Sequence, residues 1–262
     1  MSSIQSCISK GVMHVVFNRP ERKNSLTCEM YSSLCEVLDR AAQQADVKVL
    51  MLSGASGVFT AGNDLDDFLQ HPPKDADAPV FQFMLRIAAF SKPLVAAVEG
   101  LAIGVGTTLL LHCDLVYVAQ DTRFALPFVN QGLVPEAGSI LLPPRLADHQ
   151  RATEKLLFGD MFTAAEAMEL GFVNRVLPSA DVLYYAARQA ERLAQLPAGS
   201  VRGTKALMKG RAAHAGSLMA DEVSQRIRAE AGLFVQRVAG PATLEAVLAF
   251  KEKRKPNFAG MD

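Results

Sequence analysis

The sequence predicts an α/β fold. Short apolar runs of strand length alternate with segments of helical periodicity through most of the chain. The run at residues 94–98 (LVAAV) is apolar at every position, which is typical of a strand buried on both faces of a sheet. Because strands that alternate with helices need crossover connections, we expect a parallel or mixed sheet.

The N-terminal part of the chain provides two strands and a long helix. Residues 12–17 (VMHVVF) predict a strand that ends at the turn Asn18-Arg19-Pro20. Apolar side chains recur every three or four positions over residues 27–42, which predicts a helix. Residues 47–52 predict a second strand, followed by a loop over residues 53–57.

Two glycine-containing turns each lead into a predicted helix. Residues 59–65 (FTAGNDL) lead into a short helix from Asn63, and residues 100–106 (GLAIGVG) lead into a helix over residues 107–113. A helix N-terminus presents unpaired backbone N–H groups, so two such turns that meet at one point could bind a developing oxyanion. On spacing alone, turns of this kind are more often tight turns with no further role.

The later part of the chain is predicted to be mainly helical. After a strand at residues 115–119, the pattern becomes helical from about Glu136. Thr163-Ala164-Ala165-Glu166 is a capping box that opens a helix, and Gly171 closes it before a short strand at residues 172–177. Four more helices are expected over residues 181–195, 200–213, 219–238 and 243–253.

This change of pattern predicts two parts in the chain. Residues 1–199 form an α/β core that carries the candidate site, and residues 200–262 form a helical C-terminal region. The stretch at residues 71–79 (HPPKDADAP) is typical of a flexible loop, which we expect beside the cleft of the core.

The composition excludes several classes of function. The 27 basic and 27 acidic residues give no net charge, which argues against a nucleic-acid-binding protein. Charged residues or glycine interrupt each apolar run before it reaches the length of a membrane span, and the N-terminus has no signal-peptide pattern. We therefore expect a cytoplasmic protein without a membrane partner. The four cysteines form no CxxC pair and have no histidine at ligand spacing, so no metal is expected.

Glu136 and two basic clusters are the candidate polar groups. Pro135 suits the first position of a helix, which would place Glu136 in the first helical turn. Such a glutamate is usually solvated, but its apolar neighbours here favour burial. Burial raises a carboxyl pKa and a helix dipole lowers it, so the direction stays open. The basic clusters are usually solvated too, although they could hold the phosphates of a nucleotide-like ligand. They consist of Arg19, Arg22 and Lys23, and of Lys251, Lys253, Arg254 and Lys255.

Taken together, several motifs resemble those of the enoyl-CoA hydratase/isomerase (crotonase) superfamily. Each motif is short, but their order and spacing agree with that family from about residue 10 to residue 258. The matching segments are residues 17–20 (FNRP), 24–26 (NSL), 59–65 (FTAGNDL), 92–100 (KPLVAAVEG), 104–106 (GVG), 113–114 (CD), 124–127 (FALP), 132–136 (GLVPE) and 170–176 (LGFVNRV).

The resemblance implies a crotonase-like spiral of ββα units, with a helical C-terminal region that packs between the subunits of a homotrimer or a dimer of trimers. It implies an acyl-CoA thioester as the substrate, with coenzyme A as part of that substrate and no separate cofactor. By position, the oxyanion donors are the backbone N–H groups of Asn63 and Val105. The positions expected to contact coenzyme A are Ala61 and Leu65 near the adenine, Arg22 or Lys23 near the phosphates, and Phe250 and Lys253, which would reach the coenzyme A of a neighbouring subunit.

The departures from the family pattern indicate the reaction. Enoyl-CoA hydratases hold a water between two glutamates, and those positions are occupied here by Thr108 and Phe128, which cannot act as carboxylate acids or bases. Glu136 falls where peroxisomal-type Δ3-Δ2-enoyl-CoA isomerases place a single glutamate. The resemblance therefore implies a Δ3-Δ2-enoyl-CoA isomerase of the fatty-acid oxidation type, with Glu136 as the base. The alternatives are another crotonase reaction, such as hydration, and a non-catalytic CoA-binding or scaffold member of the family.

Overall fold

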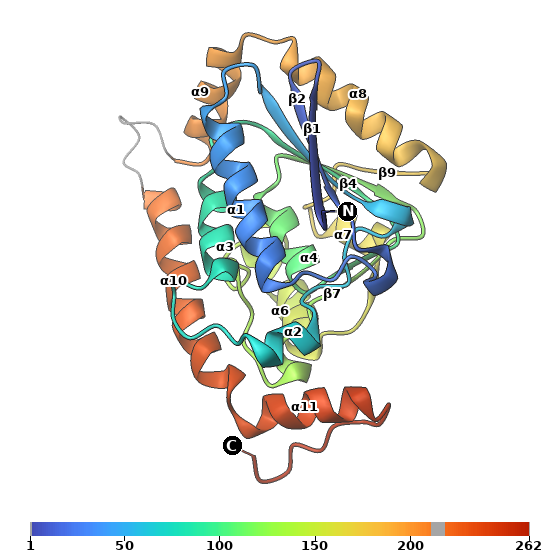
Figure 1. Ribbon diagram of the computed structural model, residues 1–262, viewed down its shortest axis with the longest axis vertical. Helices are drawn as coiled ribbons and strands as arrows, with labels where there is room; N and C mark the ends of the chain where they lie inside the picture. Colours follow the sequence, from blue (N-terminus) through green and yellow to red (C-terminus); the bar gives the residue numbers. More distant parts are fainter. Residues whose placement is uncertain (1, 211–217, 262) are drawn as a thin grey trace.

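The computed structural model describes residues 2–210 and 218–261, and it confirms the α/β fold (Figure 1). Its large sheet has the strand order β1-β2-β3-β4-β6-β9, and a smaller sheet has the order β5-β7-β8. The strands are β1 (Ile4–Ser9), β2 (Val12–Phe17), β3 (Val49–Gly54), β4 (Leu94–Val98), β5 (Leu101–Ile103), β6 (Leu115–Ala119), β7 (Arg123–Ala125), β8 (Phe162–Thr163) and β9 (Arg175–Leu177).

Parallel pairing dominates the large sheet. β1 and β2 form an antiparallel hairpin, and each later pair in this sheet is parallel. β4 and β6 belong to the large sheet, whereas β5 and β7, which follow them in the chain, pair with each other in the small sheet. The chain therefore delivers successive strands to two sheets in turn, which is the spiral arrangement that the resemblance implies.

Helices pack on both faces of the large sheet. The helices up to residue 194 are α1 (Cys28–Gln43), α2 (Leu65–Gln70), α3 (Pro79–Ala89), α4 (Val105–Thr108), α5 (Pro143–Leu146), α6 (His149–Phe158), α7 (Ala164–Glu169) and α8 (Val182–Ala194). The short 3₁₀ helices are η1 (Pro20–Arg22), η2 (Ala55–Gly57), η3 (Leu109–His112), η4 (Val129–Gln131) and η5 (Ser179–Asp181). Helices α1 and α3 pack together on one face of the sheet, and α8 packs on the other (Figure 1). Alternate residues of β4 accordingly enter two cores: Leu94 and Ala96 the first, Val95 and Ala97 the second.

Two helices begin with side-chain caps close to their predicted starts, and the cap of the second was itself predicted. The Thr27 hydroxyl accepts a hydrogen bond from the Met30 N–H at 3.3 Å, and α1 starts directly after it. Thr163 and Glu166 form the predicted capping box of α7. These starts were predictable because each cap needs only residues within four positions of one another.

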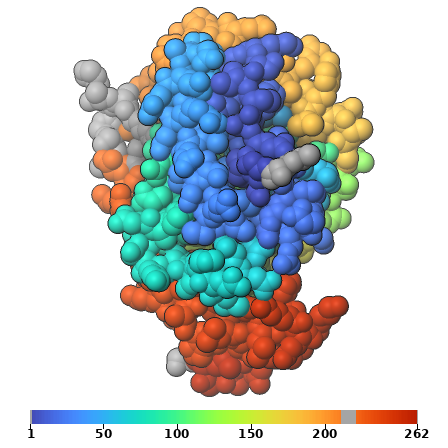
Figure 2. Space-filling model, in the orientation of Figure 1, coloured from blue at the N-terminus to red at the C-terminus, as the bar shows by residue number. Residues whose placement is uncertain are grey.

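The C-terminal helices run from one end of the molecule to the other (Figure 1). They are α9 (Ala198–Met208), α10 (Leu218–Val238) and α11 (Pro241–Lys251). α10 packs along α3, and its Phe234 ring contacts the rings of Phe68 and Phe81 with centroids 5.8 Å apart. Figure 2 shows the C-terminal segment as a layer beneath the residues around α2. The predicted division of the chain at residue 199 stays a prediction. The C-terminal region shares the main core, to which Phe234 belongs. Among the described residues no single helix suits a membrane span; α10 and α11 meet the criteria of length and apolarity only jointly, and they are bent by 69° at their junction.

The prediction that Glu136 lies in the first turn of a helix is wrong. Residues 133–136 have no regular structure, and the chain then turns through Ala137 and Gly138, whose φ angles are +59° and +73°. Two successive residues in the left-handed region cannot continue a right-handed helix. The next helix, α5, begins only at Pro143.

The helices after the two glycine-containing turns are also displaced from their predicted starts. α2 begins at Leu65 rather than at Asn63, because the Asp64 side chain caps it by accepting backbone N–H groups of the first turn. The helix predicted over residues 107–113 begins earlier, as α4, and continues as η3. The helix predicted over residues 200–213 corresponds to α9, and residues 211–213 of that prediction lie outside the described residues.

Candidate active site

A cleft of about 810 Å³ lies between the α/β core and α11. The predicted site residues that line it are Arg22, Lys23, Ala61, Asn63, Leu65, Val105 and Phe250. Lys253 does not line the cleft of its own chain, whereas Lys251 and Arg254 do. Because the resemblance assigns Lys253 to the ligand of a neighbouring subunit, that assignment stays a prediction.

The two glycine-containing turns lie side by side in this cleft. The Ile103 N–H donates to the Thr60 carbonyl at 3.1 Å, and Thr60 forms a β-bridge with Ala102. A Cβ on Gly62, where φ is +90°, would lie 2.8 Å from the Ile103 carbonyl oxygen, and a Cβ on Gly106 would lie 2.6 Å from Thr60 Cγ2. The glycines therefore permit the close approach of two segments that are distant in the sequence.

Two backbone N–H groups at this meeting point, those of Asn63 and Val105, donate to no acceptor in the described part of the chain. Val105 is the first residue of α4, where an N–H has no partner one turn earlier. Around Asn63, the residues on either side form the backbone hydrogen bonds to Leu26. The Leu26 N–H donates to the Gly62 carbonyl at 2.8 Å, and the Asp64 N–H donates to the Leu26 carbonyl at 2.9 Å. Since Asn63 and Val105 both line the cleft, their N–H groups can stabilise an oxyanion there.

Glu136 is a buried carboxylate close to this pair of donors. It is 1% exposed, and its Oε1 accepts a hydrogen bond from the Thr108 hydroxyl, one turn along the helix from Val105, at 3.4 Å. Its Oε2 has no hydrogen-bond partner among residues 2–210 and 218–261. Burial, and next the negative charge of Glu230, raise the pKa of Glu136 to about 8, against a lowering effect of the Thr108 hydroxyl. The sequence left open whether the pKa of Glu136 is raised or lowered, and in the structure it is raised.

The two positions that hydratases fill with glutamate are both near this point. Thr108 is fully buried against Glu136, and Phe128 is buried in the wall of the cleft. Neither side chain carries a carboxylate, and the acidic group in contact with Thr108 is Glu136. Glu136 itself lines neither the cleft nor the neighbouring cavity.

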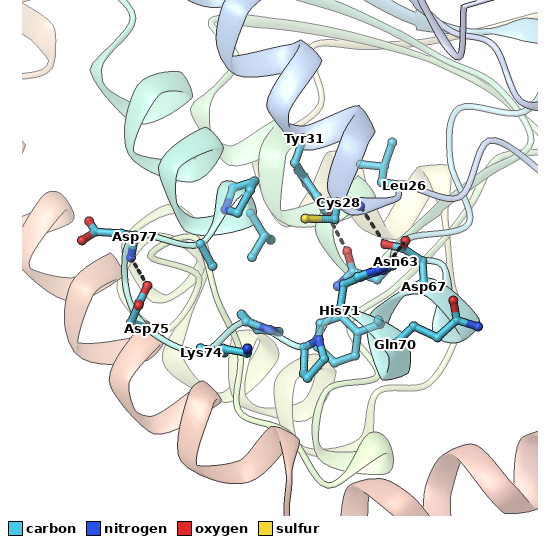
Figure 3. Close-up of a pocket in the computed structure, with 16 residues that line it drawn as sticks. Leu26, Cys28, Tyr31, Asn63, Asp67, Gln70, His71, Lys74, Asp75 and Asp77 are labelled. Carbon is cyan, nitrogen blue, oxygen red and sulfur yellow. Dashed lines mark hydrogen bonds and ion pairs between the residues drawn. The ribbon is translucent and has the colours of Figure 1, made fainter.

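A second cavity, of about 490 Å³, opens on the other side of Asn63 between α1, α2 and the segment before α3 (Figure 3). The Tyr31 hydroxyl donates a hydrogen bond to Asn63 Oδ1 within it (Figure 3). Burial, and next the negative charge of Glu136, raise the pKa of Tyr31 well above its usual range, so the Glu136 carboxylate lies within electrostatic reach of this cavity. Tyr31 was not predicted from the sequence, because it lies among the apolar residues of a helix and no motif marks its hydroxyl.

The other carboxylates near the turns make structural contacts. Asp64 caps α2 and forms an ion pair with Arg19 at 2.6 Å. Burial alone would raise the pKa of Asp64, but backbone N–H groups and the Arg19 guanidinium together lower it. Asp66 has 46% of its side chain exposed and pairs with Lys251 at 2.8 Å. Asp67 turns back to accept the N–H of Cys28 at 2.7 Å (Figure 3).

The chain matches one family model and is similar to several known proteins. The family model described as enoyl-CoA hydratase/isomerase matches residues 7–261. The chain is 33% identical to 1,2-epoxyphenylacetyl-CoA isomerase of Escherichia coli (strain K12), over 99% of each chain. It is 33% identical to enoyl-CoA delta isomerase 2 of Homo sapiens, over 77% of this chain and 52% of that protein. The crystal structure of an enoyl-CoA hydratase/isomerase from Pseudoalteromonas atlantica T6c superimposes with a TM-score of 0.91 at 36% identity, covering 98% of this chain and 100% of that one.

Proposed function

The chain belongs to the enoyl-CoA hydratase/isomerase family, and from this premise we propose that it is a Δ3-Δ2-enoyl-CoA isomerase acting on acyl-CoA thioesters. The environment of Glu136 is the main support for this function. A buried carboxylate, one oxygen of which has no partner in the described part of the chain, lies beside Thr108, while Thr108 and Phe128 replace the glutamates that hydration needs. The similarity to human enoyl-CoA delta isomerase 2 agrees with the proposal.

In this proposal coenzyme A occupies the cleft of about 810 Å³. The adenine lies near Ala61 and Leu65, and the phosphates lie at the basic rim. Arg22 already pairs with Asp66 at 3.5 Å, whereas Lys23 makes no ion pair with a described residue. Lys23 is therefore the rim cation most available to a phosphate.

The acyl group extends into the cavity of about 490 Å³. Asn63 lines both spaces, so a thioester carbonyl at its N–H would have coenzyme A on one side and the acyl chain on the other. Leucine, phenylalanine, valine and proline side chains contribute to the walls of this cavity, which suits a hydrocarbon chain.

One carboxylate and two N–H donors suffice for the reaction. Glu136 Oε2 removes a proton from C2 of the 3-enoyl thioester, and the electron pair of that bond joins the C3=C4 double bond and the carbonyl in a dienolate. The N–H groups of Asn63 and Val105 stabilise its oxyanion. The protonated Glu136 then delivers the proton to C4, which leaves the double bond between C2 and C3. A carboxyl pKa of about 8 is near the range in which a general base works at neutral pH.

A spectrophotometric assay with 3-enoyl-CoA esters of several chain lengths tests the proposal. The wild type should form the 2-enoyl esters. Glu136→Gln keeps the shape of the side chain and removes the base, so kcat should fall by ~10²–10⁴-fold while CoA-ester binding, measured by calorimetry, is retained. Rapid hydration of crotonyl-CoA without isomerisation of any 3-enoyl ester would refute the proposal, as would full isomerase activity in Glu136→Gln. Binding of the esters without turnover would support the non-catalytic alternative instead.

A further inference from the structure

A second buried carboxylate, Glu230 of α10, holds the turn that carries Glu136. Glu230 is 2% exposed. Its Oε2 accepts the N–H of Gly138 at 2.7 Å, and its Oε1 accepts the N–H of Ile140 at 3.3 Å. One side chain of the C-terminal region is thus bonded to the backbone directly after the candidate base.

The turn depends on contacts of this kind because its backbone is unusual. Ala137 has a φ of +59°, and a residue other than glycine stays in the left-handed region only where its surroundings fix it. His112 Nε2 lies 2.7 Å from the Ala137 carbonyl oxygen, and the side chains of Val223 and Ile227 lie against Gly138. The carboxylate on α10 adds the two hydrogen bonds that hold the backbone N–H groups of the turn.

We propose that Glu230 is a positioning residue for Glu136. It fixes the turn from α10, and its negative charge, in the same buried space, opposes the ionisation of Glu136. Glu230 does not touch the substrate; it acts through Glu136, so its role rests on the proposed function of Glu136 as the base. Because the two carboxylates are coupled before any substrate binds, the coupling can be measured without the reaction.

The charges around the two carboxylates determine which of them ionises first. Glu136 faces Glu230 on α10, the Tyr31 hydroxyl on α1 and the Thr108 hydroxyl on α4. Glu230 faces the N–H groups of the turn and Arg226 of its own helix. Burial raises the pKa of Glu230 to about 7, against the lowering effect of those N–H groups and Arg226, and burial raises the pKa of Glu136 to about 8. Two backbone N–H groups favour the charged form of Glu230, whereas Glu136 accepts only the Thr108 hydroxyl among the described residues, so we expect Glu230 to ionise first. Removal of its charge should then lower the pKa of Glu136.

Titration of Glu136 in charge-removal variants tests this role. Glu230→Gln removes the buried charge, and Glu222→Gln is the matched control, because it removes the same charge from an exposed position of α10 where Glu222 pairs with Arg145 at 2.8 Å. The Glu136 carboxyl is followed by ¹³C NMR in the full-length protein without substrate, and its signal is assigned by its loss in Glu136→Gln.

In Glu230→Gln the Glu136 midpoint should move to lower pH, and the acid limb of the kcat/KM profile should move with it. A less firmly held turn should also lower kcat by ~10–100-fold. Glu222→Gln should match the wild type in all three measurements. An equal Glu136 midpoint in the two variants would overturn the proposal even if kcat falls, because a purely structural role does not change the titration.

Glu230→Asp separates the effect of the negative charge from the effect of the hydrogen bonds to the turn. It also provides a second variant if Glu230→Gln folds poorly. It keeps the negative charge but is one methylene shorter, so the Glu136 midpoint should stay near that of the wild type while kcat falls. A wild-type kcat in Glu230→Asp would contradict the positioning role. A shifted midpoint in a protein that isomerises no 3-enoyl ester would refute the proposed function and still support the coupling of the two carboxylates.

Discussion

At the scale of the single residue, burial makes Glu136 a stronger base than a surface carboxylate. An exposed glutamate is ionised at neutral pH but holds a proton weakly, whereas burial raises the pKa of Glu136 to about 8. Oε2 also has no hydrogen-bond partner among the described residues, and a partner would have competed with a substrate proton. Neither property is visible in the sequence around Glu136, because each depends on side chains brought together by the fold.

The raised pKa also makes the stability of the protein depend on pH. Between the usual value of 4.5 and the folded value of about 8, the folded state keeps a proton on Glu136 that the unfolded chain has released. The folded state then binds more protons, so the free energy of unfolding falls as pH rises through this window. Glu136→Gln cannot ionise, and it should be more stable than the wild type at pH 8 by on the order of a few kcal/mol, with a difference that vanishes toward pH 5. Urea unfolding at several pH values measures this; parallel pH dependences in the two proteins would contradict it.

At the scale of the element, the position of α11 shapes the cleft. Gly132 follows η4 with a φ of +69°, and a Cβ there would lie 2.7 Å from the Thr243 nitrogen and 2.8 Å from the Ala242 carbonyl carbon. Both of these atoms lie in the first turn of α11. The helix therefore packs this closely only because Gly132 has no side chain.

Gly132→Ala should displace α11 and raise KM for CoA esters. Gly57 is a matched control, since its φ is +70° and nothing lies within 4 Å of a Cβ placed there. Gly57→Ala should lose roughly 1–2 kcal/mol of stability for the left-handed backbone alone. Gly132→Ala should lose more, and it alone should raise KM. Urea unfolding and steady-state kinetics make the comparison, and equal effects of the two substitutions would show that the close contact is unimportant.

The end of α11 also carries the predicted contact with coenzyme A. Lys251 pairs with Asp66 at 2.8 Å, whereas Lys253 is exposed and outside the cleft of its own chain. Lys253→Glu should raise KM or Kd for CoA esters about fivefold, the size expected for a partly exposed ion pair, and leave Tm unchanged. Lys255→Glu makes the same charge change two residues away and should have a smaller effect. Unchanged CoA affinity in Lys253→Glu would refute the assignment.

At the scale of the whole molecule, the sequence places six large apolar residues at helical spacing in α10 and α11, and this apolar stripe is divided between two environments. The three buried members are Phe234, Val238 and Val247, and the three exposed members are Leu233 at 51%, Leu244 at 54% and Leu248 at 49% exposure. The chain's own core therefore covers one half of the stripe. The other half remains on the surface, where large apolar side chains in one region favour a protein partner.

We expect that partner to be another copy of the chain, in a trimer or a dimer of trimers. Light scattering at micromolar concentration should give the mass of three or six chains. Leu248→Lys should weaken the assembly without unfolding the chain, whereas Leu183→Lys, at an equally exposed position of α8, should leave it intact. A stable and active monomer in the wild type would refute this expectation.

The sequence alone determined those features whose causes are local. The predicted strands at residues 94–98 and 115–119 coincide with β4 and β6, because the apolar character of these runs marks them as buried. The capping box at Thr163 could also be predicted from the sequence, because its donors and acceptors lie within four residues of one another. By contrast, β1 was not predicted: it lies at the edge of the sheet with only Ile4 buried, so it shows no strand pattern.

The tertiary structure decided the geometry around Glu136. Pro135 and the helical pattern that follows it predict a helix, but the backbone turns at Ala137 and Gly138, where Glu230, far along the chain, accepts the N–H groups of Gly138 and Ile140. The motifs likewise mark Asn63 and Val105 without showing that both N–H groups lack an acceptor among residues 2–210 and 218–261. Whether these N–H groups have an acceptor depends on which backbone groups form hydrogen bonds where the two turns meet. Hydrogen bonds between distant segments leave no periodic trace in a sequence, so the folded chain is needed to reveal them.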